Sequence, residues 1–406
     1  MRLEDGHGHL TYSTLVHPGD DWSQMWHSLT THVPAVRDAV AAAGPFGVSL
    51  RLSGASVDTL RDEPDEVERL AGFLAEQRLY LFTVNAFPHG PFKGRRVMEE
   101  VYRPDWSTST RVGYTKDIAD LLARIAPADV RPSIQSAPLA FRADVGSAEV
   151  VQRLTDNVLD VVAHLADLER RTGRCVTLAL EPEPACYLET TEETVRWFED
   201  HVYSRQGLTA LAARAGVPVS EATDLVRRHL GVVFDICHQT VGFEDVPESL
   251  DLLVRSGVPI LKLQEAAALR APEVDADVVA ELERFTDTIY LSQTTELRDG
   301  ATRRFLTLAD AIDAWREDPG GAREWRTHFH VPVFLDDLGA FGTTRFGIEQ
   351  ALGVHARTPL SSHLEIETYT WDVLPPHLKT GDVDSYVVRE LQWVRERLAA
   401  ASPART

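Results

Sequence analysis

Short apolar runs alternate with longer amphipathic stretches along nearly the whole chain. The short runs predict buried strands, and the stretches with apolar residues at three-to-four spacing predict helices. Repeated strand and helix pairs of this kind favour one (β/α)₈ barrel domain over residues 1–406. The eight predicted barrel strands are Leu10 to Thr14, Val48 to Leu52, Leu81 to Asn85, Ser133 to Ala137, Thr177 to Glu181, Val232 to Asp235, Pro259 to Gln264 and His363 to Glu367.

The predicted outer helices are Val67 to Gln77, Ile118 to Ile125, Val150 to Glu169 and Thr191 to His201, with Ser385 to Leu398 as a closing helix. The stretch of about 205–230 is longer than an ordinary barrel connection and predicts an insertion. It contains two expected helices, which begin at Leu208 and at Ser220. Ser220, followed by Glu221, is a good N-cap for the second of them.

A second predicted insertion covers about 266–326. It contains an expected hairpin of Ile289 to Glu296 and Phe305 to Leu308, joined through the turn-rich residues Arg298 to Gly300. Long insertions on barrels usually lie on the loop faces. We therefore expect the two insertions to shape access to a site.

Acidic and imidazole side chains follow several predicted strands. Glu181, Asp235 and Glu367 each stand at the end of a different strand, and His328 and His330 lie one residue apart on a short β run. A buried carboxylate is costly to desolvate unless something positive meets it. Because the ends of parallel barrel strands converge on one mouth, we expect a divalent metal site there. Carboxylates and imidazoles together suit Mn²⁺, Zn²⁺, Co²⁺ or Mg²⁺.

Composition narrows the class of partner. The chain is 44% hydrophobic and 25% charged, so it can bury a large core, and its formal net charge of −21 makes a phosphate backbone a poor partner. Its three cysteines match neither a zinc finger nor a disulfide framework, which fits a reducing compartment. No run approaches the roughly 20 apolar residues of a membrane span, and the N-terminus lacks a signal-peptide stretch. We expect a cytoplasmic protein that binds a small molecule rather than nucleic acid or membrane.

The strand-end motifs resemble the xylose isomerase-like TIM-barrel superfamily, which includes sugar isomerases, ketose epimerases, inosose dehydratases and endonuclease IV. Leu178 to Pro184 looks like its Glu-Pro-x-Pro strand end, and Asp235 to His238 looks like its acidic-x-x-His motif. His328 to His330 stands where the superfamily often has two ligands one residue apart, and Glu367 stands in place of its last-strand metal carboxylate. The resemblance spans roughly residues 10–370 and implies a xylose isomerase-like fold with a bound metal.

Four further segments are more specific and resemble the EboE group, called metabolite traffic proteins: Leu10 to Thr14 with His17 to Gly19, Val84 to Pro88, Trp325 to Val333 and Glu365 to Trp371. That name implies a small-molecule pathway but does not fix a reaction. One position departs from the superfamily, because Lys262 stands where many relatives place a metal-binding histidine. A protonated ammonium cannot bind a metal, so either Gln264 or His330 completes the shell, or the number of metals differs.

The resemblance and the residue types together give a set of expected roles. The expected metal ligands are Glu181, Asp235, His238, His330 and Glu367. The expected catalytic residues are Glu181 and Glu367 for proton transfer, with Lys262 and His238 orienting hydroxyls or a carbonyl. The expected substrate contacts are Asn85, Glu183, Gln264, His328 and Glu365.

A plainer interpretation of these residues stays open. Glu181 and Glu367 would then be barrel-rim residues that pair with Arg or Lys. Asp235 would be a helix N-cap beside a His238 that is satisfied by the loop around it. Lys262 would extend outward to solvent or pair with Glu265.

The metal interpretation predicts an isomerase, epimerase or dehydratase that acts on a small sugar or cyclitol-like polyhydroxylated metabolite. A divalent metal would hold two substrate oxygens and stabilise the negative charge that forms when a proton or hydride leaves the adjacent carbon. A non-catalytic carrier for a pathway intermediate is one alternative, because a fold alone does not decide function. An endonuclease IV-type phosphoesterase is disfavoured by the net charge of −21 and by the lack of a Lys/Arg-rich stripe.

Overall fold

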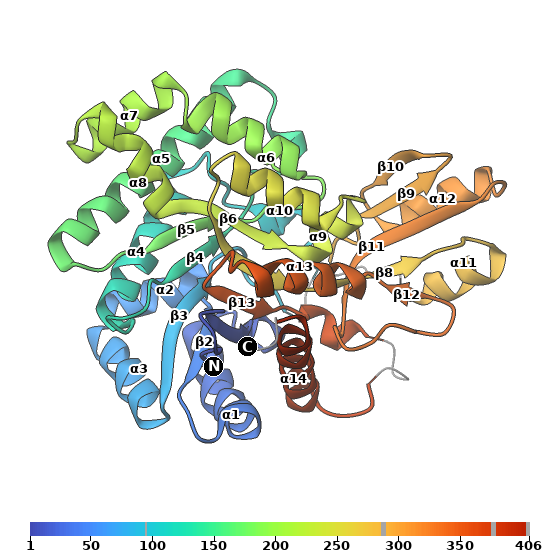
Figure 1. The fold of residues 1–406 in the computed structure, drawn as a ribbon, viewed down its shortest axis with the longest axis horizontal. Coiled ribbons are helices and arrows are strands. Elements are labelled where there is room, and N and C mark those ends of the chain that lie inside the picture. The colour runs from blue at the N-terminus through green and yellow to red at the C-terminus, as the bar shows by residue number, and fades with distance from the viewer. Residues whose placement is uncertain (94–95, 286–289, 375–378, 403–406) are drawn as a thin grey trace.

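The computed structural model describes residues 1–93, 96–285, 290–374 and 379–402. Its centre is a sheet of eight parallel strands in the order β1-β13-β7-β6-β5-β4-β3-β2 (Figure 1). All eight predicted barrel strands are present, with ends that shift by a few residues at most. They are β1 (His9–Tyr12), β2 (Phe46–Arg51), β3 (Leu79–Asn85), β4 (Ser133–Ser136), β5 (Thr177–Leu180), β6 (Leu230–Asp235), β7 (Ile260–Glu265) and β13 (His363–Ile366).

The two end strands of this order, β1 and β2, come together and nearly close the barrel. Ser13 and Ser49 form a parallel bridge between them. The hydroxyl of Thr11 donates to the carbonyl of Gly47 at 2.7 Å. Because the barrel strands are parallel, their C-terminal ends all open on the same face, and that face is where a site is expected.

Helices surround the barrel strands (Figure 1). They are α1 (Trp22–Ala41), α2 (Gly54–Asp62), α3 (Pro64–Glu76), α4 (Ser109–Ile125), α5 (Ala148–Thr172), α6 (Thr191–Trp197), α7 (Arg205–Ala215), α8 (Val219–His229), α9 (Ile236–Val241), α10 (Val246–Arg255), α13 (Arg345–Arg357) and α14 (Val383–Ala401). The described part of the chain contains no helix that is both long and apolar enough to cross a bilayer. The predicted closing helix corresponds to α14.

Helix α5 shows how the sequence sets an outer helix. The hydroxyl of Ser147 accepts a hydrogen bond from the backbone N–H of Val150 at 3.4 Å and caps the first turn. Gly173, with a φ of 72°, ends the helix in the left-handed conformation that glycine adopts without strain. Between the caps, residues such as Leu154, Val158 and Leu165 are buried on one face. Burial of that stripe against the barrel accounts for the predicted helix.

The first insertion forms two helices, as predicted, but their starts differ. Helix α7 is capped by Ser204 and begins three residues before Leu208. Helix α8 begins at Val219, directly after Pro218, so the prediction that Ser220 caps it is wrong. Proline holds its own φ near the helical value, which sets the chain for a helix from the next residue onward. Ser220 therefore lies inside the helix.

The second insertion builds a separate antiparallel sheet, which projects to the right of the barrel in Figure 1. Its strands, in the order β10-β9-β11-β8-β12, are β8 (Ala267–Ala271), β9 (Thr294–Arg298), β10 (Ala301–Phe305), β11 (Arg323–Val331) and β12 (Gly342–Thr343). It also carries helices α11 (Ala276–Leu282) and α12 (Leu308–Glu317). This added sheet continues to Thr343, so the inserted region is longer than the predicted 266–326.

The predicted hairpin of the added sheet exists, with shifted strands. Asp299 and Gly300 join β9 to β10 with positive φ values of 52° and 78°. Two positive φ values are typical of the tight turn that matches strand twist. The expected second strand of Phe305 to Leu308 is wrong beyond Phe305, because Thr307 caps α12 and Leu308 is its first residue. Ile289 lies outside the described residues.

The added sheet is anchored at the mouth of the barrel. Strand β8 follows β7 after the single residue Ala266, and β11 returns antiparallel to β8. His330 lies opposite Ala268 and Val331 lies opposite Ala267, with an irregularity in the pairing between Thr327 and His330. The end of β11 is thereby held beside the end of β7.

Candidate metal centre

Four side chains from the ends of β5, β6, β7 and β13 meet around one point. Gln264 Nε2 lies 2.7 Å from Glu181 Oε1, 2.7 Å from Asp235 Oδ2 and 2.7 Å from Glu367 Oε2. An amide nitrogen carries two hydrogens and cannot serve three carboxylates. Gln264 Oε1 is buried and has no hydrogen-bond partner among the described residues. This group, which we call the carboxylate cluster, is therefore short of positive charge.

Two further amides support the carboxylate cluster. Gln135 Nε2 donates to Glu181 Oε2 at 2.6 Å, and Asn85 Nδ2 donates to Glu367 Oε1 at 2.9 Å. Burial, and then the neighbouring carboxylates, raise the pKa of both Glu181 and Glu367 well above the usual value. The described residues provide neither carboxylate with an Arg or Lys partner, so the rim-pair alternative does not hold.

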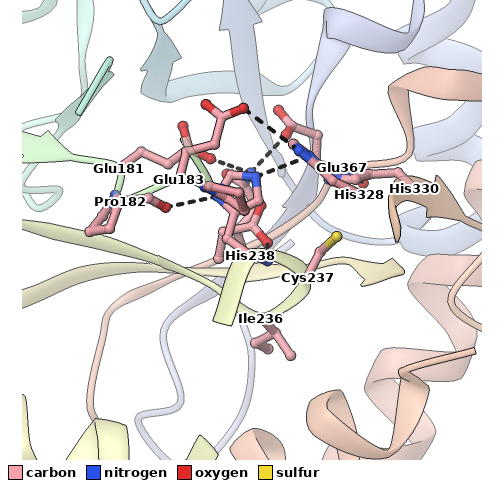
Figure 2. A network of polar contacts seen from close by, with 12 residues as sticks. Glu181, Pro182, Glu183, Ile236, Cys237, His238, His328, His330 and Glu367 are labelled. Atoms are coloured by element: carbon pink, nitrogen blue, oxygen red, sulfur yellow. Dashed lines mark hydrogen bonds and ion pairs between the residues drawn. The ribbon is translucent and has the colours of Figure 1, made fainter. Parts of the chain in front are cut away.

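Three histidines meet beside the carboxylate cluster, and Figure 2 shows their rings turned toward one another. His328 Nε2 lies 3.2 Å from His238 Nε2 and 3.2 Å from His330 Nε2. The opposite nitrogen of each ring faces an acceptor: His238 Nδ1 lies 2.8 Å from the carbonyl of Pro182, His330 Nδ1 lies 2.7 Å from the carbonyl of Glu367, and His328 Nδ1 lies 2.9 Å from Gln293 Oε1. We call these three residues the histidine cluster.

These contacts fix the tautomer of each ring in the histidine cluster. A carbonyl oxygen only accepts, so each Nδ1 must carry the hydrogen, and in a neutral imidazole Nε2 then carries a lone pair. Burial lowers the pKa of His238 to about 3 and that of His330 to about 4, so both rings are neutral. The hydroxyl of Tyr369, 3.4 Å from His328 Nε2, supplies one hydrogen at most. Converging lone pairs repel each other unless a cation lies between them.

The spacing of the histidine cluster fits a metal ion. Zinc binds imidazole nitrogen at roughly 2.0–2.1 Å in tetrahedral sites, which places two such nitrogens about 3.3–3.4 Å apart. The observed separations of 3.2 Å are close to that value. Each Nδ1–H is also held by an acceptor, as is usual for metal-binding histidines.

Asp235 joins the two clusters. Its Oδ1 accepts a hydrogen bond from the backbone N–H of His238 at 3.0 Å and caps α9, so the N-cap alternative is correct for that oxygen. Its Oδ2 lies 3.6 Å from His238 Nε2 as well as 2.7 Å from Gln264 Nε2. Ligand atoms of Asp235, His238 and His330 all lie within 4.8 Å of one another. Asp235 is therefore placed to complete a metal site with the histidines.

Glu183 is held differently from the other carboxylates. The hydroxyl of Tyr102 donates to Glu183 Oε1 at 2.9 Å, while Oε2 is buried and has no hydrogen-bond partner among the described residues. Burial raises the pKa of Glu183 to about 8. Gln293 Nε2 donates to the Tyr102 hydroxyl at 3.0 Å and to the carbonyl of Pro184 at 3.1 Å, which turns Gln293 Oε1 toward His328. One small network thus orients both Glu183 and a histidine.

Lys262 lies inside the barrel rather than at its surface. Its side chain is fully buried, and Nζ donates to Gln135 Oε1 at 2.7 Å and to Glu365 Oε2 at 2.9 Å. The alternative of a lysine extended to solvent is therefore wrong, and so is the pairing with Glu265, because the buried carboxylate that Lys262 contacts is Glu365. Neither Lys262 nor Glu365 is among the described residues that line the cavity. Gln135 does line it, so Lys262 lies behind Gln135 and would not contact a molecule bound in the cavity.

A cavity of about 510 Å³, partly open to solvent, lies over both clusters. Its floor is polar and includes Asn85, Gln135, Glu181, Glu183, His238, His328 and Glu367. Its roof is apolar and includes Leu15, Phe87, Pro88, Phe92, Val97, Met98, Val101, Tyr290 and Leu291. Tyr102 and Tyr369 stand between the two parts.

The structure brings together most of the residues that the sequence singled out. The predicted metal ligands and Asn85, Glu183, Gln264 and His328 all lie at or directly below the cavity floor. The residues missed are Gln135, Tyr102, Gln293 and Tyr369. Gln135 is the central residue of the predicted strand Ser133 to Ala137, and a polar residue inside a predicted buried strand was a usable signal.

Comparison with known proteins supports the fold. No family model matches the sequence, and no curated protein matches it. Among solved structures, a xylose isomerase-like TIM-barrel protein from Mycobacterium smegmatis in complex with magnesium is 9% identical, with 99% of this chain and 100% of that one covered and a TM-score of 0.53. The chain thus has a nearly closed, xylose isomerase-like TIM-barrel fold.

Two other solved structures show the range of proteins that this chain resembles. The IolI protein with a bound zinc atom is 12% identical, with 98% and 100% of the two chains covered and a TM-score of 0.48. A D-tagatose 3-epimerase-like protein is 12% identical, with 97% and 98% covered and a TM-score of 0.46. At such identities the likeness concerns the fold and not the reaction.

Proposed function

We propose that this chain is a divalent-metal-dependent enzyme that isomerises, epimerises or dehydrates a small hydroxylated carbonyl compound of the sugar or cyclitol type. The observation that carries the proposal is the convergence of three imidazole lone pairs beside buried carboxylates, on the floor of a cavity. A bound cation supplies Lewis-acid stabilisation of negative charge on a substrate oxygen. Neutral imidazoles with carboxylates suit Zn²⁺, Co²⁺ or Mn²⁺.

The residues that would hold the metal follow from the two clusters. His238, His328, His330 and Asp235 form one donor set around the converging nitrogens. Glu181, Glu367 and Gln264 form a neighbouring donor set on the other side of Asp235. His328, expected to contact substrate, is proposed here as a ligand because its Nε2 is the nitrogen nearest to both other histidines.

Glu183 is the group best placed to move a proton. One oxygen of Glu181 and one of Glu367 accept hydrogen bonds from Gln135 and Asn85, and the other oxygen of each lies 2.7 Å from Gln264 Nε2, so amides surround both carboxylates. Glu183 Oε2 is unpartnered among the described residues and belongs to the cavity floor. It would take a proton from the carbon beside a substrate carbonyl. Return of that proton to the neighbouring carbon gives an isomer, and loss of a hydroxyl with a proton as water gives a dehydrated product.

We also propose that the chain belongs to a particular group within this class of barrel proteins. The segments Leu10 to Thr14 with His17 to Gly19, Val84 to Pro88, Trp325 to Val333 and Glu365 to Trp371 favour the EboE metabolite traffic group. Phe87 and Tyr369 from these segments line the cavity, and His328 belongs both to one of the segments and to the histidine cluster. A carrier function in such a pathway is the alternative that the experiment must separate.

Metal analysis and hydrogen exchange together test the proposal. The divalent metal content of purified and zinc-reconstituted protein is measured first, by elemental analysis. The metal-loaded protein is then incubated in D₂O with a panel of ketoses, aldoses and inososes, and deuterium incorporation is followed by NMR. We expect incorporation at one carbon next to a carbonyl, and a fall of at least about 10²-fold in Glu183→Gln.

The control for that experiment is Glu390→Gln, which changes a buried glutamate of α14 that belongs to neither cluster. Glu390 Oε1 accepts hydrogen bonds from Thr368 and from the backbone N–H of Val333, and the side-chain oxygen of glutamine can accept both. This variant should keep both metal content and exchange. Absence of a bound divalent metal would overturn the proposal. Metal binding with ligand-induced NMR shifts, but without exchange or dehydration over the whole panel, would favour the carrier.

A further inference from the structure

We infer that the natural ligand of this cavity is amphiphilic: an oxygen-rich end that faces the metal floor, joined to an uncharged hydrocarbon or aromatic group that faces the roof. The inference rests on the proposed function for the oxygen-rich end only. Within the sugar or cyclitol type of the proposed function, a compound that carries such an apolar group matches this cavity better than one with hydroxyls on every side.

The roof is built from apolar side chains that are not part of the barrel core. Leu15, Phe92, Val97, Tyr290 and Tyr369 are buried and form an apolar cluster of their own. They come from the loop after β1, the loop after β3, the inserted region and the loop after β13, so they meet only above the mouth of the barrel. Because several separate loops supply apolar groups to the same place, the roof is a constructed surface and not an extension of the core.

A second small cluster continues the same surface. Phe87, Tyr102 and Leu291 pack together, with Met98 and Val101 against them. All five line the cavity. Val101 packs against both clusters, so together they give the cavity one joined apolar lining.

Aromatic rings form the part of the roof nearest to the histidine cluster. The ring centroids of Phe92 and Tyr290 lie 4.8 Å apart, and those of Tyr290 and Tyr369 lie 5.3 Å apart. The Tyr369 ring also packs on His330, with centroids 4.6 Å apart. An aromatic wall that reaches a metal-binding histidine favours a ligand whose apolar group begins close to its metal-binding oxygens.

The polar floor and the apolar roof favour opposite kinds of ligand group. A hydroxyl placed against apolar side chains loses its water without gaining a partner, which weakens binding. A methylene placed there gains about fourfold in affinity, because removal of apolar area from water is favourable. The roof therefore selects against a polyol and in favour of a hydrocarbon of the same length.

Matched hydroxamic acids test this selection, because a hydroxamate is a small oxygen chelator whose other end can be varied. Hexanohydroxamate and gluconohydroxamate have the same number of carbons and differ in their hydroxyls, and benzohydroxamate adds a ring. Binding of each is measured by calorimetry, on the zinc-loaded and on the metal-free protein. We expect hexanohydroxamate and benzohydroxamate to bind the zinc-loaded protein at least about 10²-fold more tightly than gluconohydroxamate.

A pair of variants assigns the preference to the roof. Val97→Thr replaces one methyl of the roof by a hydroxyl of nearly the same shape, and it should lower the ratio of hexanohydroxamate to gluconohydroxamate affinity at least about threefold. Val40→Thr makes the same change at a buried position of α1, away from the cavity, and should leave the ratio unchanged. Thermal unfolding of both variants shows that they are folded.

The outcomes separate this inference from the proposed function. Binding of zinc with equal or tighter binding of gluconohydroxamate overturns the inference and leaves the metal enzyme standing. Failure to bind zinc, with hexanohydroxamate still preferred by the metal-free protein, overturns the proposed function and supports the apolar selection. An unchanged ratio in Val97→Thr, with the fold intact, overturns the assignment of the preference to the roof.

Discussion

The carboxylate cluster and the histidine cluster lie side by side, but they differ in how they are satisfied. In the carboxylate cluster, amide hydrogens of Gln264, Gln135 and Asn85 stand between the oxygens and replace part of the missing positive charge. In the histidine cluster each Nδ1 is held by an acceptor, so no ring hydrogen lies between the converging nitrogens. The carboxylate cluster is thus partly satisfied by amide hydrogens, whereas nothing but a cation can lie between the converging nitrogens of the histidine cluster, which therefore needs the cation more.

This difference assigns an order of binding to the two donor sets. Soft-to-borderline ions such as Zn²⁺ prefer imidazole nitrogen, while Mg²⁺ and Mn²⁺ accept an oxygen shell. We therefore expect the first cation to reside at the histidine cluster with Asp235. The carboxylates would hold a second cation or orient the substrate.

The largest expected effect is a difference in zinc binding between His330→Ala and Glu181→Gln. His330→Ala removes a nitrogen of the histidine cluster and should lower the affinity for the first zinc by more than about 10²-fold, beyond the 10–100-fold cost of losing an outer partner. Glu181→Gln keeps the histidines and should leave the first zinc bound while weakening any second one. Zinc titration followed by elemental analysis measures both, and equal loss in the two variants would mean that the clusters form a single site.

Lys262→Met should cause the largest loss of stability. It leaves Glu365 buried without its cation, and breaking a buried ion pair from one side costs about 3–5 kcal/mol. Chemical unfolding measures the free energy of unfolding of the single variant and of Lys262→Met with Glu365→Gln. The double variant should recover part of the loss, because no uncompensated charge remains. The first zinc should bind as before, since Lys262 supports the carboxylate cluster through Gln135 and not the histidines.

Glu390 provides a buried carboxylate outside both clusters, and its behaviour depends on pH. Burial raises its pKa to about 7, above the ordinary value of 4.5, so the folded state favours the protonated acid. Stability from this group is complete below about pH 4.5 and is lost as the pH rises to about 7, by about 3 kcal/mol in total.

The test compares the unfolding free energies of the wild type and Glu390→Gln from pH 4.5 to pH 8. The difference between the two proteins should grow in favour of the variant as the pH rises. A difference that does not change with pH would show that Glu390 stays ionised in the folded protein.

Gln293→Leu should have the smallest of these effects. It removes the acceptor that fixes the tautomer of His328, and outer partners of this kind typically contribute 10–100-fold to metal affinity. Gln135→Leu is a matched control, because it removes an amide that serves the carboxylate cluster. A competitive chelator titration should show weaker binding of the first zinc in Gln293→Leu and unchanged binding in Gln135→Leu. The opposite result would exchange the roles of the two clusters.

The floor of the site could be predicted from the sequence because its residues stand at strand ends. Glu181, Asp235, Gln264 and Glu367 each follow or end a short apolar run, and parallel strands bring such positions to one face. The eight strands were found for the same reason, since a buried parallel strand has a strong apolar signal. Element ends were less accurate where a proline or a cap decided them, as at Pro218 and Thr307.

The rest of the site could not be predicted because it depends on contacts between distant loops. The apolar roof joins side chains from separate loops, none of which carries a pattern that indicates its neighbours. Gln293 and His328 are 35 residues apart and meet only because β9 and β11 pair. The tautomers of the histidines likewise follow from carbonyls whose positions are set by the tertiary fold.

The added sheet supplies two of the three histidines, and the barrel supplies the third, His238. A cation held by all three would act as a removable cross-link between the two parts of the molecule, and would stabilise their docking by an amount that grows with the logarithm of its free concentration. Amide hydrogen exchange in the added sheet would then slow as the concentration of free metal rises, while exchange in the barrel would not change. Shortening the inserted region would remove ligands as well as a surface, so it cannot vary freely in length as ordinary loops do.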